Sequence, residues 1–106
     1  MKNYVISGSV DLGPGLGADD GGAIEIQRFM SDSGAVSAAA NLARRGDRVA
    51  LVFPHDNPDP ALEAYAQRQL RESAPAERFR IVRLPEQSPT TFLREALADW
   101  LSTPRN

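Results

Sequence analysis

The densest group of polar residues in the sequence directly follows its most compact apolar run. The run is Val49–Phe53, and the polar residues after it are His55, Asp56, Asn57 and Asp59. Carboxylates held close together supply the oxygen ligands that Mg²⁺ takes in proteins, usually together with bound water. Asp56 and Asp59 therefore predict a magnesium site, with Asp11 as a third candidate ligand.

The same residues are also typical of the start of a helix. Asn57 or Asp59, each followed by a proline, would provide an N-cap, and Asp56 would stabilise the positive end of the helix dipole. Both interpretations can hold, because one carboxylate can cap a helix while another binds a cation. His55 is the only histidine, and no serine or cysteine nucleophile lies in a recognisable motif beside it. We therefore expect His55 to orient a loop or contact a ligand rather than to act as a general base.

Glycine is concentrated between residues 8 and 22, where six of the eight glycines lie. Gly13, Gly15 and Ala18 have the spacing of a glycine-rich dinucleotide-binding turn, which makes Gly13 and Gly15 candidate ligand-binding residues. Such a turn must lead directly into a helix whose amides hold the pyrophosphate, whereas Pro14 interrupts this stretch and three aspartates lie within it. We therefore favour a flexible glycine-rich loop over residues 11–22.

A third group of candidate residues lies between residues 86 and 91, ahead of the last predicted helix. Ser88 and the first amides of that helix could receive an anion. Ser88 is also a typical helix cap, and we favour the capping role. Three arginines, Arg78, Arg80 and Arg83, place positive charge along the preceding predicted strand, which makes a nucleic-acid-binding patch a further hypothesis.

These groups need secondary structure that brings them together. Strand-forming residues bounded by turn residues predict strands at Tyr4–Val10, Val49–Phe53 and Arg78–Leu84. The uninterrupted apolar run of Val49–Phe53 predicts burial on both faces, as in a parallel sheet. The segment Ile24–Phe29 fits both strand alternation and helical spacing, and we favour a strand. Helices are predicted from the caps at Ser31–Ser33 to Gly46, from Asn57 or Asp59 to the residues before Pro75, and from Ser88 to the residues before Pro104.

Alternation of strands and helices is typical of the α/β class. We expect a compact Rossmann-like sandwich, with a sheet of about four mainly parallel strands and helices on both faces. Ligands of such sheets bind beyond the carboxyl ends of the strands. The loops after Val10, Phe53 and Leu84 should therefore form one rim, which collects the three groups of candidate residues.

Length and composition agree with a single domain over residues 1–106. The absence of cysteine excludes disulfides and thiolate catalysis. The net charge of -2 argues against nucleic-acid binding through the charge of the whole protein, although it does not exclude a local basic patch. No apolar run approaches the roughly 18 residues of a membrane span, and no secretory signal is recognisable. We therefore expect a cytoplasmic protein without a membrane partner.

The order of these segments resembles a known family. The chain resembles the Toprim domains of primases, topoisomerases and conjugation or phage nucleic-acid enzymes. The segments that carry the resemblance are, in order, Val5–Asp11, Val49–Asp59 and Arg78–Leu84 with its following helix. In that family a first strand ends in a Glu-Gly signature and a later strand ends in an Asp-x-Asp pair. The resemblance implies a compact parallel α/β fold, a bound metal ion and a role in nucleic-acid metabolism.

The resemblance also assigns positions. It implies that Ser7 and Gly8 stand at the Glu-Gly signature, which makes both candidate ligand-binding residues. It also implies that Asp56 matches the first metal-binding aspartate and that Asp59 substitutes for the second. This chain departs from the family pattern at two points. A serine cannot perform the acid-base work of the glutamate, and Pro58 occupies the position of the second aspartate. The resemblance therefore implies a member that is degenerate at the catalytic positions.

Three functional hypotheses follow. The leading one is a Toprim-like accessory module in plasmid, phage or replication nucleic-acid metabolism, which acts by binding and has no catalytic residue. Its cofactor would be Mg²⁺, and its partner would be nucleic acid or a larger nucleic-acid-processing protein. The second is a nucleotide- or phosphometabolite-binding protein or small enzyme that uses the glycine-rich loop and the helix starts at Asn57 and Ser88. The third is a protein-protein interaction module.

Overall fold

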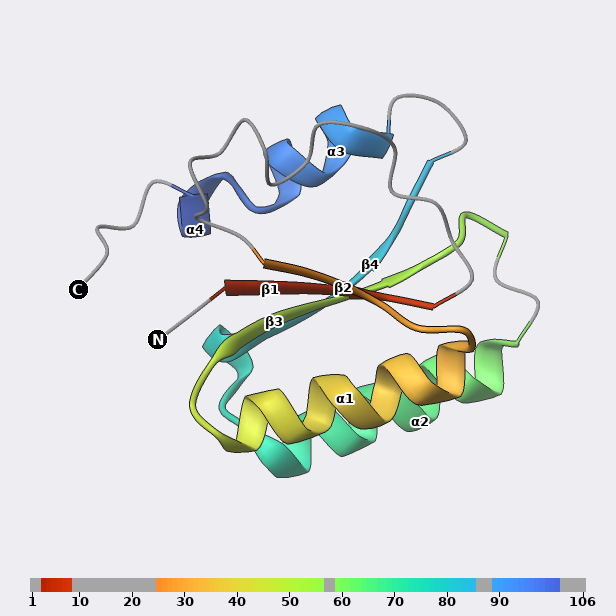
Figure 1. Cartoon of the computed structure of the whole chain (residues 1–106), viewed down its shortest axis with the longest axis vertical. Coiled ribbons are helices and arrows are strands. Elements are labelled where there is room, and N and C mark those ends of the chain that lie inside the picture. Colours follow the sequence, from red (N-terminus) through yellow and green to blue (C-terminus); the bar gives the residue numbers. More distant parts are fainter. Residues whose placement is uncertain (1–2, 9–24, 57–58, 86–88, 102–106) are drawn as a thin grey trace.

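The structure is a computed structural model that describes residues 3–8, 25–56, 59–85 and 89–101. Its sheet consists of the parallel strands β1 (Asn3–Ser7), β2 (Glu25–Arg28), β3 (Arg48–Phe53) and β4 (Phe79–Arg83), in the order β2-β1-β3-β4. Helices α1 (Asp32–Arg44) and α2 (Pro60–Ser73) cover one face, and α3 (Pro89–Ala96) and α4 (Ala98–Leu101) cover the other (Figure 1). The predicted α/β sandwich with a parallel sheet is confirmed.

Side chains of the strands alternate between two hydrophobic clusters, one on each face of the sheet. From β3, Val49, Leu51 and Phe53 join the cluster beneath α1 and α2, whereas Ala50 and Val52 join the cluster beneath α3 and α4. All five of these side chains are at most 1% exposed. The strand is therefore buried on both faces, which is what its uninterrupted apolar run predicted.

The helix boundaries follow from capping residues. Ser31 is the N-cap of α1, and its hydroxyl accepts a hydrogen bond of 3.1 Å from the amide of Gly34. Gly46 follows α1 with a φ of +97°, a conformation that favours glycine. Of the two predicted starts of the next helix, Asp59 is correct, since α2 begins at Pro60. The segment after residue 24 forms β2, so the strand interpretation is also correct.

The prediction of one continuous C-terminal helix is wrong, because the helix breaks at Leu97 into α3 and α4. A regular helix would bring the amide of Trp100 to the carbonyl of Ala96. Here the amide of Trp100 donates instead to the carbonyl of Leu97, at 2.9 Å. The Ala96 carbonyl accepts a hydrogen bond of 2.7 Å from Nη1 of Arg80 in β4. A side chain from the sheet thus takes the acceptor that the helix would need.

None of the helices in the described segments combines the length and the hydrophobicity needed to cross a membrane. The longest of them, α2, has 14 residues.

Tyr4, which is buried in the sheet, makes the stability of the protein depend on pH. Its side chain is 5% exposed, and its pKa is raised from the usual 10.0 by burial first, then by the charges of Glu25 and Asp47 and a hydrogen bond with Glu25. A raised pKa in the folded state means that folding favours the protonated phenol. The stability that the buried Tyr4 phenol contributes is therefore complete below pH 10, and it is lost as the pH rises through the pKa of the folded state.

We expect Tyr4→Phe to retain more of its neutral-pH stability at alkaline pH than the wild type does. Urea unfolding at pH 8 and pH 11 measures the loss in each protein. Tyr65→Phe is the matched control, because it removes a hydroxyl from a side chain that is 46% exposed, and it should lose as much stability as the wild type. Equal losses in Tyr4→Phe and Tyr65→Phe would contradict the assignment.

Candidate functional site

The carboxyl end of the sheet, where all four strands finish, brings the predicted candidates together. β1 and β3 are neighbours, with Ser7 opposite Val52. From β1 the chain continues to β2 on one side, whereas β3 continues through α2 to β4 on the other side. This reversal of strand order is a topological switch point, the place at which open α/β sheets bind their ligands. The candidate site therefore lies between the ends of β1 and β3.

Ser7 closes β1 at this point. It is 0% exposed, and its carbonyl accepts a hydrogen bond of 2.8 Å from the amide of Phe29. Its hydroxyl is also buried and makes no hydrogen bond in the described structure. Buried hydroxyls in native proteins almost always have a partner, because an unsatisfied one costs about 1–3 kcal/mol. At this end of the sheet, Ser7 therefore has a buried hydroxyl that no described group uses for a hydrogen bond.

Gly8 follows Ser7 and packs directly against the start of α1. A Cβ atom placed on Gly8 would lie 2.3 Å from Oδ1 of Asp32, 2.7 Å from its Cα and 2.8 Å from its backbone nitrogen. Contacts this short are not possible, so the end of β1 approaches α1 only because residue 8 has no side chain. The sequence analysis predicted Gly8 as a ligand-binding residue and missed this packing role, since Asp32 is distant in the sequence.

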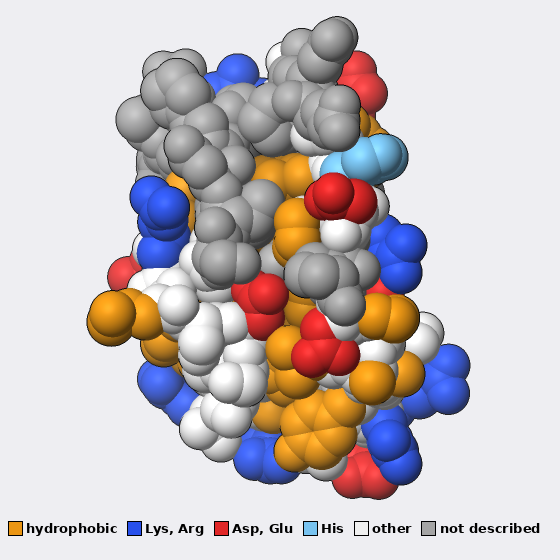
Figure 2. Space-filling model, turned by 90° about the vertical axis from the view of Figure 1, so that its right-hand side faces the viewer, with side chains coloured by type: hydrophobic (Ala, Val, Ile, Leu, Met, Phe, Trp, Pro, Cys, Tyr) orange, Lys and Arg blue, Asp and Glu red, His pale blue; other side chains and the backbone are white. Residues whose placement is uncertain are grey.

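The loop after β3 presents the other candidates. His55 and Asp56 are exposed and lie directly after Phe53 and Pro54. Figure 2 looks onto the carboxyl end of the sheet and shows the histidine beside an acidic side chain, with further acidic side chains around an apolar strip. The acidic side chains around this strip attract cations, whereas basic side chains lie at both sides of the same view.

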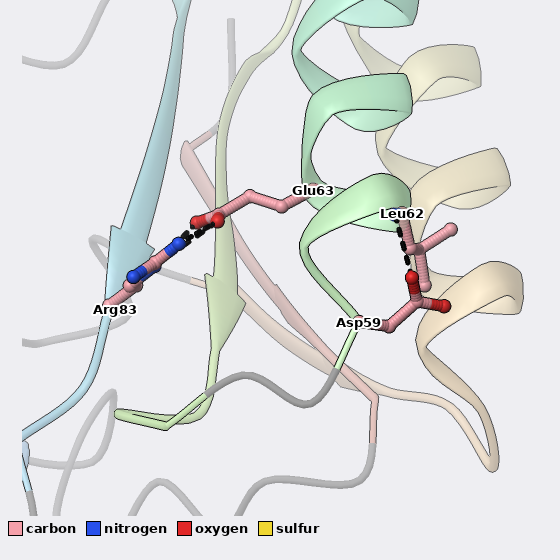
Figure 3. A network of polar contacts seen from close by, with 4 residues as sticks. All are labelled: Asp59, Leu62, Glu63 and Arg83. Atoms are coloured by element: carbon pink, nitrogen blue, oxygen red, sulfur yellow. Dashed lines mark hydrogen bonds and ion pairs between the residues drawn. The ribbon is translucent and has the colours of Figure 1, made fainter.

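Asp59 has a structural role at the start of α2. Its Oδ1 accepts a hydrogen bond of 3.1 Å from the amide of Leu62 (Figure 3), which satisfies one of the free amides in the first turn. Helix capping, the second of the two predicted roles, is therefore present. Helix capping does not test the magnesium role of Asp59, which stays a prediction.

In the described ranges, no three carboxylate or histidine side chains come close enough together to hold a metal ion. Among the predicted site residues, Ser7, Gly8, His55, Asp56 and Asp59 all lie at the carboxyl end of the sheet. The others, Asp11, Gly13, Gly15, Asn57 and Ser88, fall outside the described residues. What the described site offers is one exposed carboxylate on the β3 loop, a nearby histidine and a buried hydroxyl.

An ion pair between Arg83 and Glu63 fixes the geometry beside this site, and the sequence analysis missed it. Nε of Arg83 donates to both carboxylate oxygens of Glu63, at 2.9 and 3.1 Å, and Nη2 donates to Oε2 (Figure 3). These hydrogen bonds, followed by the charge of Glu63, raise the pKa of Arg83 above its already high value. The pair joins the end of β4 to the first turn of α2.

The chain matches no family model, and neither a curated protein nor a solved structure shows significant similarity to it. The geometry of the described residues is therefore the basis for assigning a function.

Proposed function

We propose that this protein is a binding module of nucleic-acid metabolism that holds a phosphate group at the carboxyl end of its sheet, through Mg²⁺ bound to Asp56. The observation that carries the proposal is the switch point between β1 and β3, where β1 ends at Ser7 beside the strand that leads to Asp56. An acidic surface repels phosphate unless a cation lies between them. Mg²⁺ fits that role, since it binds few carboxylates and keeps positions for phosphate oxygens.

The proposed role is binding rather than catalysis. The Toprim resemblance puts Ser7 where the family has its acid-base glutamate, and Ser7 is fully buried. A serine hydroxyl is a weak acid and cannot take up a proton at neutral pH as a carboxylate does. It can donate a hydrogen bond to a phosphate oxygen, which would satisfy the buried hydroxyl. Without the glutamate, this position cannot perform acid-base catalysis, although a ligand can still bind at this end of the sheet.

Removal of the Asp56 carboxylate is expected to weaken Mg²⁺ binding at least tenfold, which corresponds to about 1.4 kcal/mol. Isothermal titration of Mg²⁺ into the wild type and Asp56→Ala measures the difference. Glu72→Gln is the control, because it removes one exposed negative charge from the last turn of α2, at the opposite end of the sheet. Absence of Mg²⁺ binding in the wild type, or equal affinity in Asp56→Ala, would exclude the metal role.

Asp59→Asn separates the two roles of its side chain, because asparagine also caps helices. If Asp59 only caps α2, the variant should bind Mg²⁺ like the wild type. Weaker Mg²⁺ binding at unchanged thermal stability would make Asp59 a second ligand.

A second candidate function, binding of a mononucleotide or small phosphometabolite, is favoured by the acidic surface at the carboxyl end of the sheet. A nucleic-acid strand would bring several phosphates to this surface, whereas a nucleotide complexed with one Mg²⁺ brings little net charge. A thermal-shift panel with Mg²⁺ distinguishes the two candidates. Stabilisation by mononucleotides but not by single-stranded DNA would establish the second candidate over the first.

A further inference from the structure

A groove between α1 and α2 lies apart from the candidate site. The two helices lie side by side on one face of the sheet (Figure 1). The described residues that line the groove are Val36, Ser37, Ala40, Asn41 and Arg44 from α1, and Tyr65 and Gln69 from α2. The volume of the groove is about 260 Å³, slightly below the range of about 300–1,000 Å³ for sites of drug-sized ligands. The groove therefore has room for a small molecule.

The apolar part of the groove consists of a buried floor and an exposed aromatic wall. Val36 and Ala40 are 1% and 4% exposed and form the floor. Ser37 and Ala40 have small side chains, so α1 leaves space where it faces α2. Tyr65 of α2 borders this space, and its side chain is 46% exposed. An apolar group that enters the groove would therefore contact both the floor and the aromatic ring.

The polar part of the groove carries one positive charge, that of Arg44. This arginine is exposed in the last turn of α1, and its Nη1 donates a hydrogen bond of 3.1 Å to Oδ1 of Asn41. The bond orients the guanidinium and leaves its other N–H groups for a ligand. Among the lining residues that the structure describes there is no aspartate or glutamate. The groove therefore favours an anion over a cation.

We propose that this groove binds a small monocarboxylate that carries an aromatic or other apolar group. Its carboxylate accepts hydrogen bonds from Arg44, whose planar fork of donors matches two carboxylate oxygens. Its apolar group covers Val36 and Ala40 beside the ring of Tyr65. One guanidinium balances one negative charge. A phosphate ester brings about two negative charges and would meet the negative end of the α1 dipole, so the carboxylate fits better.

Hydrocinnamate is a suitable probe, because it joins a phenyl ring to one carboxylate that is ionised at neutral pH. Its titration into isotope-labelled protein is followed by two-dimensional NMR of the backbone amides, without Mg²⁺. We expect saturable shifts around Ala40, Asn41 and Tyr65, with the millimolar affinity that is usual for so small a ligand. Hydrocinnamide, the uncharged amide of the same acid, should bind about fivefold more weakly. Equal binding of the acid and the amide would overturn the role of the charge.

Arg44→Gln should weaken hydrocinnamate binding about fivefold, because it removes the charge and the donor fork from an exposed side chain. Arg45→Gln is the matched control, since it removes the same charge from the next residue, which is exposed and does not line the groove. It should change the affinity less than about twofold. Equal losses in the two variants would overturn the proposal, because they would show a diffuse charge effect. The amide spectra also report whether each variant is folded.

Tyr65→Ala tests the aromatic wall and should also weaken hydrocinnamate binding about fivefold. Phe92→Ala is its control, because it removes an exposed aromatic ring from α3, on the opposite face of the sheet. The affinity of Phe92→Ala should equal that of the wild type. Unchanged binding in Tyr65→Ala would overturn the contact between the ligand and the ring.

Two further ligands test the chemical class. Phenyl phosphate has a similar ring with a phosphate group, and tighter binding of it than of hydrocinnamate in the groove would overturn the choice of a monocarboxylate. Acetyl-Gly-Phe carries the same ring and carboxylate at the end of a peptide, and binding at least tenfold tighter than that of hydrocinnamate would assign the groove to a protein C-terminus instead. Absence of saturable shifts at the groove with hydrocinnamate would overturn the proposal as a whole.

Discussion

Replacement of Gly8 by alanine is expected to lower the free energy of unfolding by about 3 kcal/mol, at the upper end of the effects of overpacking. The added Cβ would lie 2.7 Å from Cα and 2.8 Å from the backbone nitrogen of Asp32. Both atoms belong to the first residue of α1, so the clash cannot be relieved by rotation of a side chain. Either β1 or the start of α1 must move. Urea unfolding followed by circular dichroism measures the change.

Gly34→Ala is the control for Gly8→Ala, because it makes the same chemical change two residues later than Asp32, inside α1. Its Cβ would lie 3.2 Å from Oγ of Ser31 and in ordinary contact with Phe29, at 3.8 and 4.0 Å. Alanine also favours helix by about 1 kcal/mol over glycine. The stability of Gly34→Ala should therefore remain within about 1 kcal/mol of the wild type. If Gly8→Ala were equally stable, the close approach of β1 to α1 would be wrong.

Truncation of Phe53 to alanine is expected to cost about 3–5 kcal/mol, the range for large aromatic side chains in protein cores. Phe53 is 1% exposed and belongs to the cluster between the sheet and the pair α1 and α2. Single domains are stable by only about 5–15 kcal/mol, so the variant should be close to unfolding at 37 °C. Thermal and urea unfolding provide the measurement.

Phe92→Ala is the matched control for Phe53→Ala, because the same atoms are removed from a side chain of α3 that is 37% exposed. Surface substitutions of this kind usually change stability by less than about 0.5–1 kcal/mol. A similar cost for both substitutions would mean that Phe53 is not a core residue. Phe53 also ends the strand that leads to Asp56, so Mg²⁺ binding should fall with stability in Phe53→Ala but not in Phe92→Ala.

Features that depend on short stretches of the chain could be predicted from the sequence. The apolar run from Val49 to Phe53 predicted a strand buried on both faces, because no residue in it suits contact with water. Ser31 and Gly46 predicted the two ends of α1, since capping is decided by side chains within three residues of the helix end. Strand order could not be predicted in this way, because hydrophobic periodicity identifies the buried face of a strand but not its neighbours.

The features that were missed depend on contacts between distant residues. The break at Leu97 requires Arg80, which reaches Ala96 from β4 across 16 positions of the chain. The pair of Arg83 and Glu63 spans 20 positions and forms only when β4 and α2 are in place. The sequence predicted the candidate residues at the carboxyl end of the sheet, where the described ones lie. It could not reveal that the hydroxyl of Ser7 is buried without a partner, because burial there depends on the assembled sheet.

The order of strands also sets a lower limit on when the protein can fold during its synthesis. Of the four described strands, β1 is translated first, yet it lies in the interior of the sheet between β2 and β3. Its hydrogen bonds on one side must therefore wait until Arg48–Phe53 has left the exit tunnel. Until then Tyr4, Val5 and Ile6 form an apolar strand with an open edge, a species that is prone to pair with other chains. The nascent chain is consequently most vulnerable to aggregation between the emergence of β1 and the emergence of β3 from the exit tunnel.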